Sequence, residues 1–141
     1  MKTFSVTTQI NSKPEVIWRI LTDAPKYASW NTTVDKVEGR IERGQKVTVH
    51  AKINPGRAFP VKVTEFVPNS RMVWTGGMPL GLFTGERTFT LTPTSDGSVT
   101  FAMSEIYTGL LASLIGRSIP DLQPAFDEFA LALKRKAEGR S

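Results

Sequence analysis

The polar residues best placed to do chemistry, Glu105, Tyr107 and Arg87, belong to two neighbouring stretches in which apolar and polar residues alternate. Side chains at every second position of a strand share one face. The face that carries Glu105 and Tyr107 also carries Val99, Phe101 and Met103. The face that carries Arg87 also carries Phe83, Gly85, Phe89 and Leu91. We therefore expect a carboxylate, a guanidinium and a phenol on an otherwise apolar wall.

A hairpin around residues 93–97 would make these two stretches adjacent strands. With Thr92 opposite Ser98, Arg87 lies opposite Met103 and diagonal to Glu105, within reach of long side chains. Because a buried charge must be paired or functional, three interpretations stay open. The pair braces the sheet, or it anchors a ligand's hydroxyl, carbonyl or carboxylate, or Glu105 opens from the pair and acts as a general base.

Other reaction chemistries lack the residues they need. The chain has no cysteine, which excludes a disulfide scaffold, a thiolate metal site and a cysteine nucleophile. Its one histidine, His50, alternates with Lys46 and Lys52 on the expected solvent face, so neither a metal site nor a Ser-His-Asp triad is predicted. The glycines match no nucleotide-binding loop, and we expect no cofactor.

Aromatic and methionine side chains at inward positions could line a ligand pocket, although ordinary core packing explains each one singly. The candidates for ligand binding, besides Arg87, Glu105 and Tyr107, are Trp30, Phe59, Trp74, Met78, Phe83, Phe89, Phe101 and Met103. The apolar, glycine-rich segment 76–81 predicts either the mouth of a cavity or a tight turn.

The alternation and its breaks predict the elements that position these residues. One strand is expected at 3–10, and six more at 33–41, 46–53, 59–67, 71–75, 82–92 and 98–107. A helix follows the first strand, with Ser12 and Glu15 as a capping box and Pro14 in its first turn, and residues 26–30 form a second short helix.

The C-terminal part returns to helical spacing. Residues 109–115 form a short helix or a lid, and a long amphipathic helix follows, interrupted at Pro124 by a kink or a restart. Its apolar positions are Ile119, Leu122, Phe126, Phe129 and Leu133. An antiparallel sheet buries one face, and only this helix is long enough to cover it. The space between them is the expected ligand site.

The order of elements, together with residues 10–18 (INSKPEVIW), 21–23 (LTD) and 27–31 (YASWN), resembles the START-like or SRPBCC superfamily. Its polyketide cyclase/dehydrase branch is the most similar. The resemblance implies an α+β helix-grip fold, in which a curved seven-stranded antiparallel sheet wraps a long C-terminal helix around a hydrophobic cavity. Residues 1–141 then form a single START-like domain. Members of the superfamily carry lipids or sterols, cyclise polyketides or assist chaperones.

Composition restricts the partners. The net charge of +5 comes largely from Lys134, Lys136 and neighbouring arginines at the expected helix end, and no aromatic residue is interleaved with them, so nucleic acid binding is not expected. No apolar run approaches the ~20 residues that span a bilayer. The first residues lack a signal-peptide pattern. We expect a cytoplasmic protein without membrane insertion, monomeric or weakly homodimeric.

Three functions remain open from the sequence. The first is binding of a small hydrophobic molecule such as a lipid, a sterol or a polyketide-like compound, with its polar group towards Arg87, Glu105 and Tyr107. The second is a cyclase or dehydratase in which Glu105 is the base. The third is a module that binds a chaperone or another protein partner.

Overall fold

The computed structural model describes residues 3–52, 58–117 and 119–139. The strands are β1 (Thr3–Ile10), β2 (Val34–Gly39), β3 (Lys46–Ala51), β4 (Phe59–Val67), β5 (Arg71–Met78), β6 (Phe83–Pro93) and β7 (Val99–Thr108). The helical elements in these ranges are α1 (Pro14–Thr22), the 3-10 helix η1 (Ala24–Lys26), α2 (Tyr27–Trp30), α3 (Ala112–Gly116) and α4 (Gln123–Ala137).

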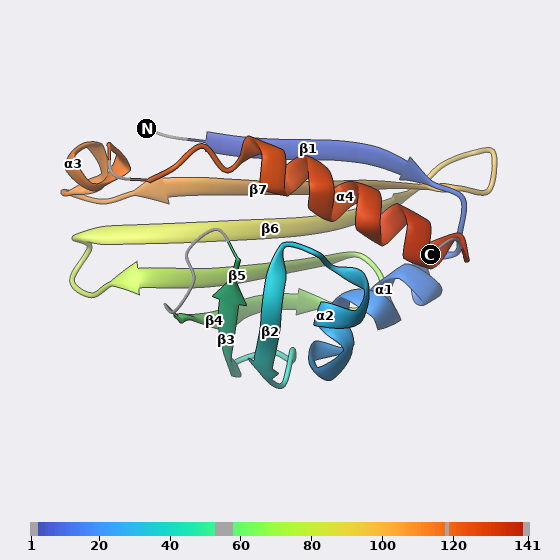
Figure 1. Ribbon diagram of the computed structural model, residues 1–141, viewed down its shortest axis with the longest axis horizontal. Helices are drawn as coiled ribbons and strands as arrows, with labels where there is room; N and C mark the ends of the chain where they lie inside the picture. The colour runs from blue at the N-terminus through green and yellow to red at the C-terminus, as the bar shows by residue number, and fades with distance from the viewer. Residues whose placement is uncertain (1–2, 53–57, 118, 140–141) are drawn as a thin grey trace.

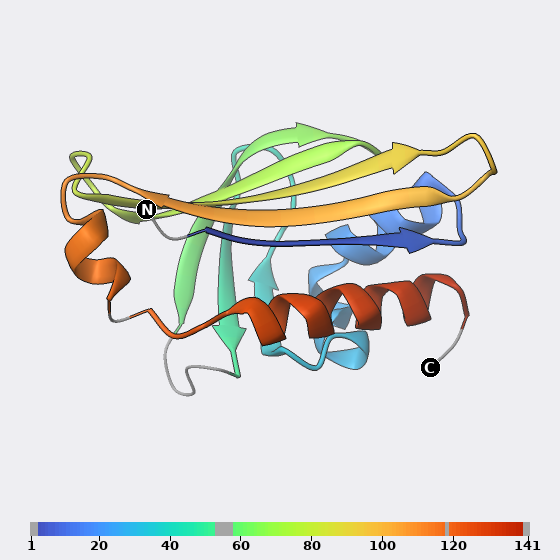
Figure 2. The same ribbon diagram turned by 90° about the horizontal axis from the view of Figure 1, so that it is seen from above.

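All seven strands form one antiparallel sheet in the order β1-β7-β6-β5-β4-β3-β2. The first two strands of the chain are therefore its two edges, and α1, η1 and α2 connect them. The sheet curls, and α4 lies along its concave side below β1 and β7 (Figures 1 and 2). This arrangement confirms the predicted helix-grip fold.

The apolar face of α4 packs against the concave side of the sheet. Its buried side chains, spaced three, one and three residues apart, are Phe126, Phe129, Ala130 and Leu133. The helix begins at Gln123 with Pro124 in its first turn, where the missing N–H of proline costs no hydrogen bond. The predicted interruption at Pro124 is thus a restart, and Ile119 lies ahead of the helix.

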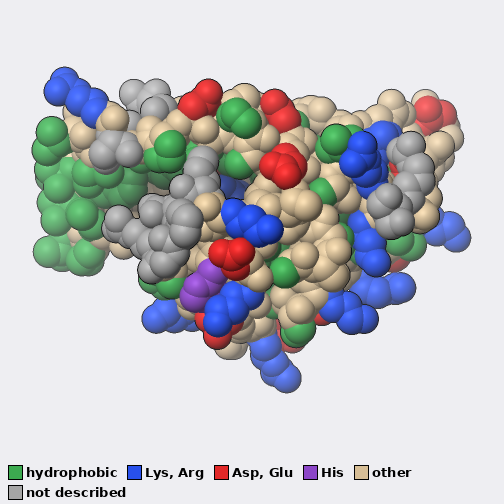
Figure 3. Space-filling model, in the orientation of Figure 1, with side chains coloured by type: hydrophobic (Ala, Val, Ile, Leu, Met, Phe, Trp, Pro, Cys, Tyr) green, Lys and Arg blue, Asp and Glu red, His purple; other side chains and the backbone are tan. Residues whose placement is uncertain are grey.

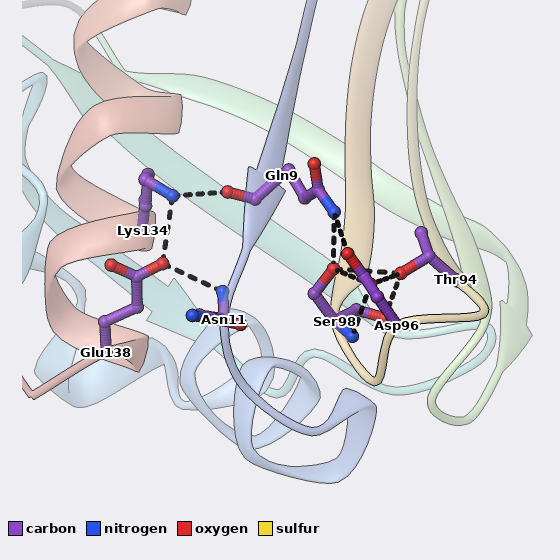
Figure 4. Close-up of polar contacts among 7 residues, drawn as sticks. All are labelled: Gln9, Asn11, Thr94, Asp96, Ser98, Lys134 and Glu138. Carbon is purple, nitrogen blue, oxygen red and sulfur yellow. Dashed lines mark hydrogen bonds and ion pairs between the residues drawn. The ribbon is translucent and has the colours of Figure 1, made fainter.

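Polar contacts fix the C-terminal end of α4 to the sheet (Figure 4). The Lys134 ammonium donates to the Gln9 carbonyl and, at 2.9 Å, to the Glu138 carboxylate. Glu138 also accepts the backbone N–H of Asn11 at 2.8 Å. The Gln9 side chain donates to Ser98 Oγ at 2.6 Å, in the turn between β6 and β7. The last turns of α4, the end of β1 and this turn are thereby held together.

The register of the β6–β7 hairpin differs from the predicted one by two residues. Arg87 lies directly opposite Glu105 instead of Met103. The cause is the turn: β6 continues through Pro93, and residues 94–98 close the connection with a 2.9 Å bond from the amide of the first to the carbonyl of the last. The prediction placed the turn too early.

Two other local predictions were wrong. The strand predicted at 71–75 continues as β5 to Met78, which pairs with Phe83, so half of segment 76–81 is strand. The capping box does not form: Lys13 is the N-cap of α1 and no side chain caps it, so Ser12 lies one residue too early. Pro14 sets this start, since its fixed φ suits the first helical position.

Candidate functional site

The candidate site is built from one row of side chains that crosses the concave face of the sheet. Val63, Trp74, Arg87, Glu105 and Phe4 are successive register partners on β4, β5, β6, β7 and β1. Directly opposed side chains on one face are close enough to interact. The predicted neighbours Arg87 and Glu105 are therefore brought together more directly than expected.

Glu105 is held by two donors. Arg87 Nε lies 2.8 Å from Glu105 Oε1, and the side chains of Arg87 and Glu105 are 26% and 14% exposed. The Tyr107 hydroxyl donates to the other carboxylate oxygen, Oε2. Both oxygens of the carboxylate are thus occupied by side chains of its own sheet, and charge-assisted bonds of this kind are the stronger class.

Arg87 is less fully used. Its Nε–H goes to Glu105, and the described residues accept no bond from its other N–H groups. The guanidinium carbon lies 4.8 Å from the centre of the Phe126 ring on α4, a cation–π distance. The guanidinium therefore sits between helix and sheet with hydrogen-bonding capacity to spare.

Tyr107 covers a gap in the sheet surface. Gly85 and Gly76 are register partners on the same inner face, and a Cβ at Gly85 would lie 3.1 Å from the Tyr107 ring. The ring also stacks on Phe83, with centroids 5.5 Å apart. Burial and the neighbouring Glu105 carboxylate raise the pKa of the Tyr107 phenol above its ordinary range. The phenol is consequently a donor, not a base.

Five of the predicted ligand-binding side chains belong to the buried aromatic core beside this row: Trp30, Trp74, Phe89, Phe101 and Met103. The Phe129 ring of α4 is a neighbour of three of them, 5.4 Å from Trp30 and 6.2 Å from Phe89 and Phe101, and Trp74 lies 4.8 Å from Phe89. Among the described residues, the ring contacts of these side chains are with each other, with Tyr27 and with Phe129 of α4.

Unpartnered donors lie inside this aromatic core. The indole N–H groups of Trp30 and Trp74 and the side-chain amide nitrogen of Asn31 are buried and have no hydrogen-bond partner in the described part of the chain. Both indoles flank Tyr27, at ring distances of 5.0 and 6.3 Å. Burying a donor without an acceptor costs free energy. An acceptor atom from outside the chain would therefore form favourable hydrogen bonds with these N–H groups.

The remaining predicted residues stand at one end of the sheet, where β4 and β6 begin and β5 ends, which we call the open end of the site. Phe59 on β4 and Met78 on β5 are 37% and 47% exposed, whereas Phe83 is half-buried under Tyr107. Phe59 and Met78 are therefore accessible from outside, unlike the core aromatics.

A pocket of about 350 Å³ lies elsewhere, among residues of β3, β4 and β5 and Gly44, which precedes β3. Its lining comprises Gly44, Lys46, Pro60, Val61, Lys62, Thr75, Gly76 and Gly77. The lining includes none of the predicted ligand-binding residues, and Lys46 and Lys62 face away from the α4 side by strand alternation. This hollow is separate from the row that holds Arg87.

His50 takes part in a surface contact. Its Nε2 lies 2.6 Å from Glu38 Oε1, between β3 and β2, and this hydrogen bond together with Lys36 lowers the pKa of Glu38. Within the ranges that the structure describes, no group of three or more His, Asp or Glu side chains could hold a metal ion.

Sequence reasoning missed three features of the site: the Phe126 ring over Arg87, the paired inner glycines and the unpartnered indoles. The first two had signals. Phe126 stands on the apolar stripe of α4, and Gly85 stands on the inward face of β6. No sequence signal could have revealed the unpartnered indoles, because whether an N–H has an acceptor depends on packing among distant segments.

The sequence profile described as "Polyketide cyclase / dehydrase and lipid transport" matches residues 1–138. The chain belongs to this family. A search of curated proteins finds no match for the sequence. Family membership and the START-like fold together suggest ligand binding. Among the described residues, no helix is long and apolar enough to cross a lipid bilayer.

Three solved structures illustrate the shared fold. A START superfamily protein from Mycobacterium smegmatis has a TM-score of 0.69 and 16% identity, covering 97% of both chains. The Aha1 dimer from Colwellia psychrerythraea scores 0.72 at 19% identity, covering 98% of this chain and 97% of that one. A truncated norcoclaurine synthase from Thalictrum flavum scores 0.69 at 14% identity, covering 99% and 95%. These identities establish the fold alone.

Proposed function

We propose that this protein binds a small hydrophobic molecule between the sheet and α4, with the polar group of the molecule against Arg87, Glu105 and Tyr107. Lipids, sterols and polyketide-like compounds have this character. Phe59, Met78 and Phe83 would line the open end, and Trp30, Trp74, Phe89, Phe101 and Met103 the inner wall. Pockets of this type are mostly apolar with a few fixed polar groups.

The unused N–H groups of Arg87 are the observation that carries this proposal. A guanidinium that is three-quarters buried beside Phe126 has one bond to Glu105. Its remaining donors match a carbonyl, phenolate or carboxylate oxygen. The buried indoles of Trp30 and Trp74 add support, since a second acceptor atom on the ligand would form hydrogen bonds with their N–H groups.

The first experiment identifies the molecule. Native mass spectrometry of the purified protein should show a mass above that of the chain, and extraction followed by small-molecule analysis should identify the compound. Tryptophan fluorescence then gives its affinity. A chain without extra mass, and without a fluorescence change across fatty acids, sterols and aromatic polyketides, would argue against the proposal.

The second experiment tests the anchor. The double variant Arg87→Met/Glu105→Gln removes the charges together, so no lone buried charge remains. Hydrogen bonds to charged groups contribute about 1.5–3 kcal/mol, so affinity should fall about tenfold or more. Arg71→Met/Glu65→Gln is the matched control, because that pair has the same 2.8 Å Nε–Oε1 contact and is more exposed, at 43% and 44%. Equal affinities in both double variants would refute the anchor.

A catalytic function is the second candidate, supported by the Glu105–Tyr107 contact beside Arg87. Glu105 would abstract a proton after release from one donor, and Tyr107 or Arg87 would stabilise the resulting enolate oxygen. One of the solved structures that share this fold is named a synthase, the norcoclaurine synthase from Thalictrum flavum. Glu105→Gln separates the two functions: a carrier keeps nearly its full affinity, whereas an enzyme keeps binding and loses turnover of the extracted compound.

A further inference from the structure

A cluster of exposed aliphatic side chains covers one end of the molecule. Its members are Met78, Leu80, Leu110 and Leu114, which are 47%, 91%, 82% and 63% exposed. The space-filling view shows hydrophobic side chains gathered at the end that carries α3 and the β5–β6 turn (Figure 3). We name these four residues the apolar end. Contiguous exposed apolar patches of this kind mark interaction surfaces.

The apolar end is a built structure rather than a loose loop. The Leu110 amide donates to the Gly81 carbonyl at 3.1 Å, and the Leu111 amide to the Leu82 carbonyl at 2.8 Å. Gly109 has a φ of +115°, and a Cβ there would lie 2.7 Å from the Leu82 carbonyl oxygen. The β5–β6 turn and the chain leading to α3 are therefore joined by backbone bonds that present both sets of leucines together.

Leu80 is costly for the protein in solution. Its φ of +61° lies in the left-handed region, which favours glycine and asparagine over leucine. Its side chain is 91% exposed and gains no burial in return. A leucine at this position is advantageous only when an apolar phase covers it.

The charges near the apolar end indicate what kind of partner covers it. Residues 76–85 and 106–116 contain no charged side chain, and the next residue, Arg117, is exposed and basic. Aliphatic side chains next to the exposed cation of Arg117 match the boundary of an anionic lipid bilayer.

We propose that the apolar end docks this protein on the surface of anionic lipid bilayers, with Leu80, Leu110 and Leu114 at the headgroup–acyl boundary and Arg117 among the headgroups. This is peripheral adsorption, without a spanning segment. It stands independently of the proposed ligand site. Because Phe83 and Tyr107 lie directly behind the β5–β6 turn, docking would bring the open end of that site to the lipid surface.

The test is cosedimentation of the full chain with vesicles of mixed phosphatidylcholine and phosphatidylglycerol, compared with phosphatidylcholine alone. Wild type should partition onto the anionic vesicles, and Leu80→Glu/Leu110→Glu should weaken that partition about tenfold or more. Leu131→Glu is the control, since Leu131 is 46% exposed on α4, away from the apolar end. It should bind vesicles as wild type does.

Leu80→Asn separates docking from folding. Asparagine tolerates the left-handed backbone, so the variant should melt at the same or a higher temperature while binding vesicles more weakly. A lower melting temperature would mean that Leu80 serves the fold, and would count against docking. Arg87→Met/Glu105→Gln should still bind vesicles, which distinguishes failure of the ligand site from failure of the docking surface.

Several outcomes overturn the proposal. Wild type that stays in the supernatant with anionic vesicles contradicts it, as does a Leu80→Glu/Leu110→Glu variant that sediments like wild type. The last contradicting outcome would come from light scattering. If wild type is a dimer, the double variant is a monomer and neither binds vesicles, the surface is the interface with a second copy of the chain.

Discussion

Glu105 is the centre of the polar group on the inner wall, and its two oxygens are used by different partners. One accepts from Arg87 and the other from Tyr107. A ligand that approaches this group meets the spare donors of Arg87 first, because the carboxylate is already occupied. The arrangement favours recognition of an acceptor-bearing molecule over proton abstraction by Glu105.

The two tyrosines of the chain should resist alkaline titration. Burial raises the pKa of Tyr27, whose hydroxyl donates to the Leu21 carbonyl at 2.6 Å, and burial and Glu105 raise that of Tyr107. A raised folded-state pKa contributes stability that is complete below the unfolded value of about 10 and is lost as pH rises above it. Tyrosinate absorbance should therefore appear together with unfolding, as followed by circular dichroism. A folded protein with one tyrosine titrating near pH 10 would contradict this.

Trp74→Phe should cost the ligand-free protein little. The substitution leaves a small cavity but also removes a buried N–H that lacks an acceptor, a group whose burial costs about 1–3 kcal/mol. The free energy of unfolding in urea should change by less than about 1 kcal/mol. Trp18→Phe is the control: Trp18 packs on Phe66 at 5.3 Å and is not among the unpartnered donors, so its loss should cost more. The reverse order would show that the Trp74 N–H is satisfied, for instance by a buried water.

These side chains show what the sequence could and could not predict. The inward faces of β6 and β7 were predictable because side chains alternate with a period of two residues. Their register was not, because it depends on where the turn closes, and the bonds of Thr94, Asp96 and Ser98 decide that. The spare donors of Arg87 could not be foreseen either, since they depend on the register and on the position of Phe126.

The helix α4 joins the sheet to the aromatic core mainly through Phe129. Its ring contacts Tyr27 and Trp30 of α2, Phe89 of β6 and Phe101 of β7. The three- and four-residue spacing of apolar positions predicted the buried side of this helix. The start at Gln123 could not be predicted from the sequence, because Pro124 is compatible with either a kink or a first turn.

Phe129→Ala should destabilise the protein by about 3–5 kcal/mol, the usual cost of removing a buried aromatic ring. Chemical denaturation monitored by circular dichroism measures this, with Leu131→Ala as the control because Leu131 is 46% exposed on the same helix. A loss below about 1 kcal/mol would mean that the core around Phe129 is loosely packed.

The whole chain should unfold in one step, since we propose that residues 1–141 form a single domain. The connection from β1 to β2 runs through helices that cross from one sheet edge to the other, and α4 packs on β1 and on the aromatic core. A domain of this size usually unfolds as one cooperative unit. Far- and near-ultraviolet circular dichroism should give coincident transitions in urea. Two separated transitions would contradict a single domain.

The pairing of β1 with β7 has a consequence for synthesis. Thr3 lies opposite Ile106 and Ile10 opposite Val99, so β1 leaves the ribosome long before the strand that pairs with it. Pairings between such distant segments form slowly, and strands that wait for them are prone to aggregate. During translation β1 has no permanent neighbour until β7 emerges. Nascent chains that stop before β7 therefore keep an open edge, and they are the forms that holdase chaperones should capture.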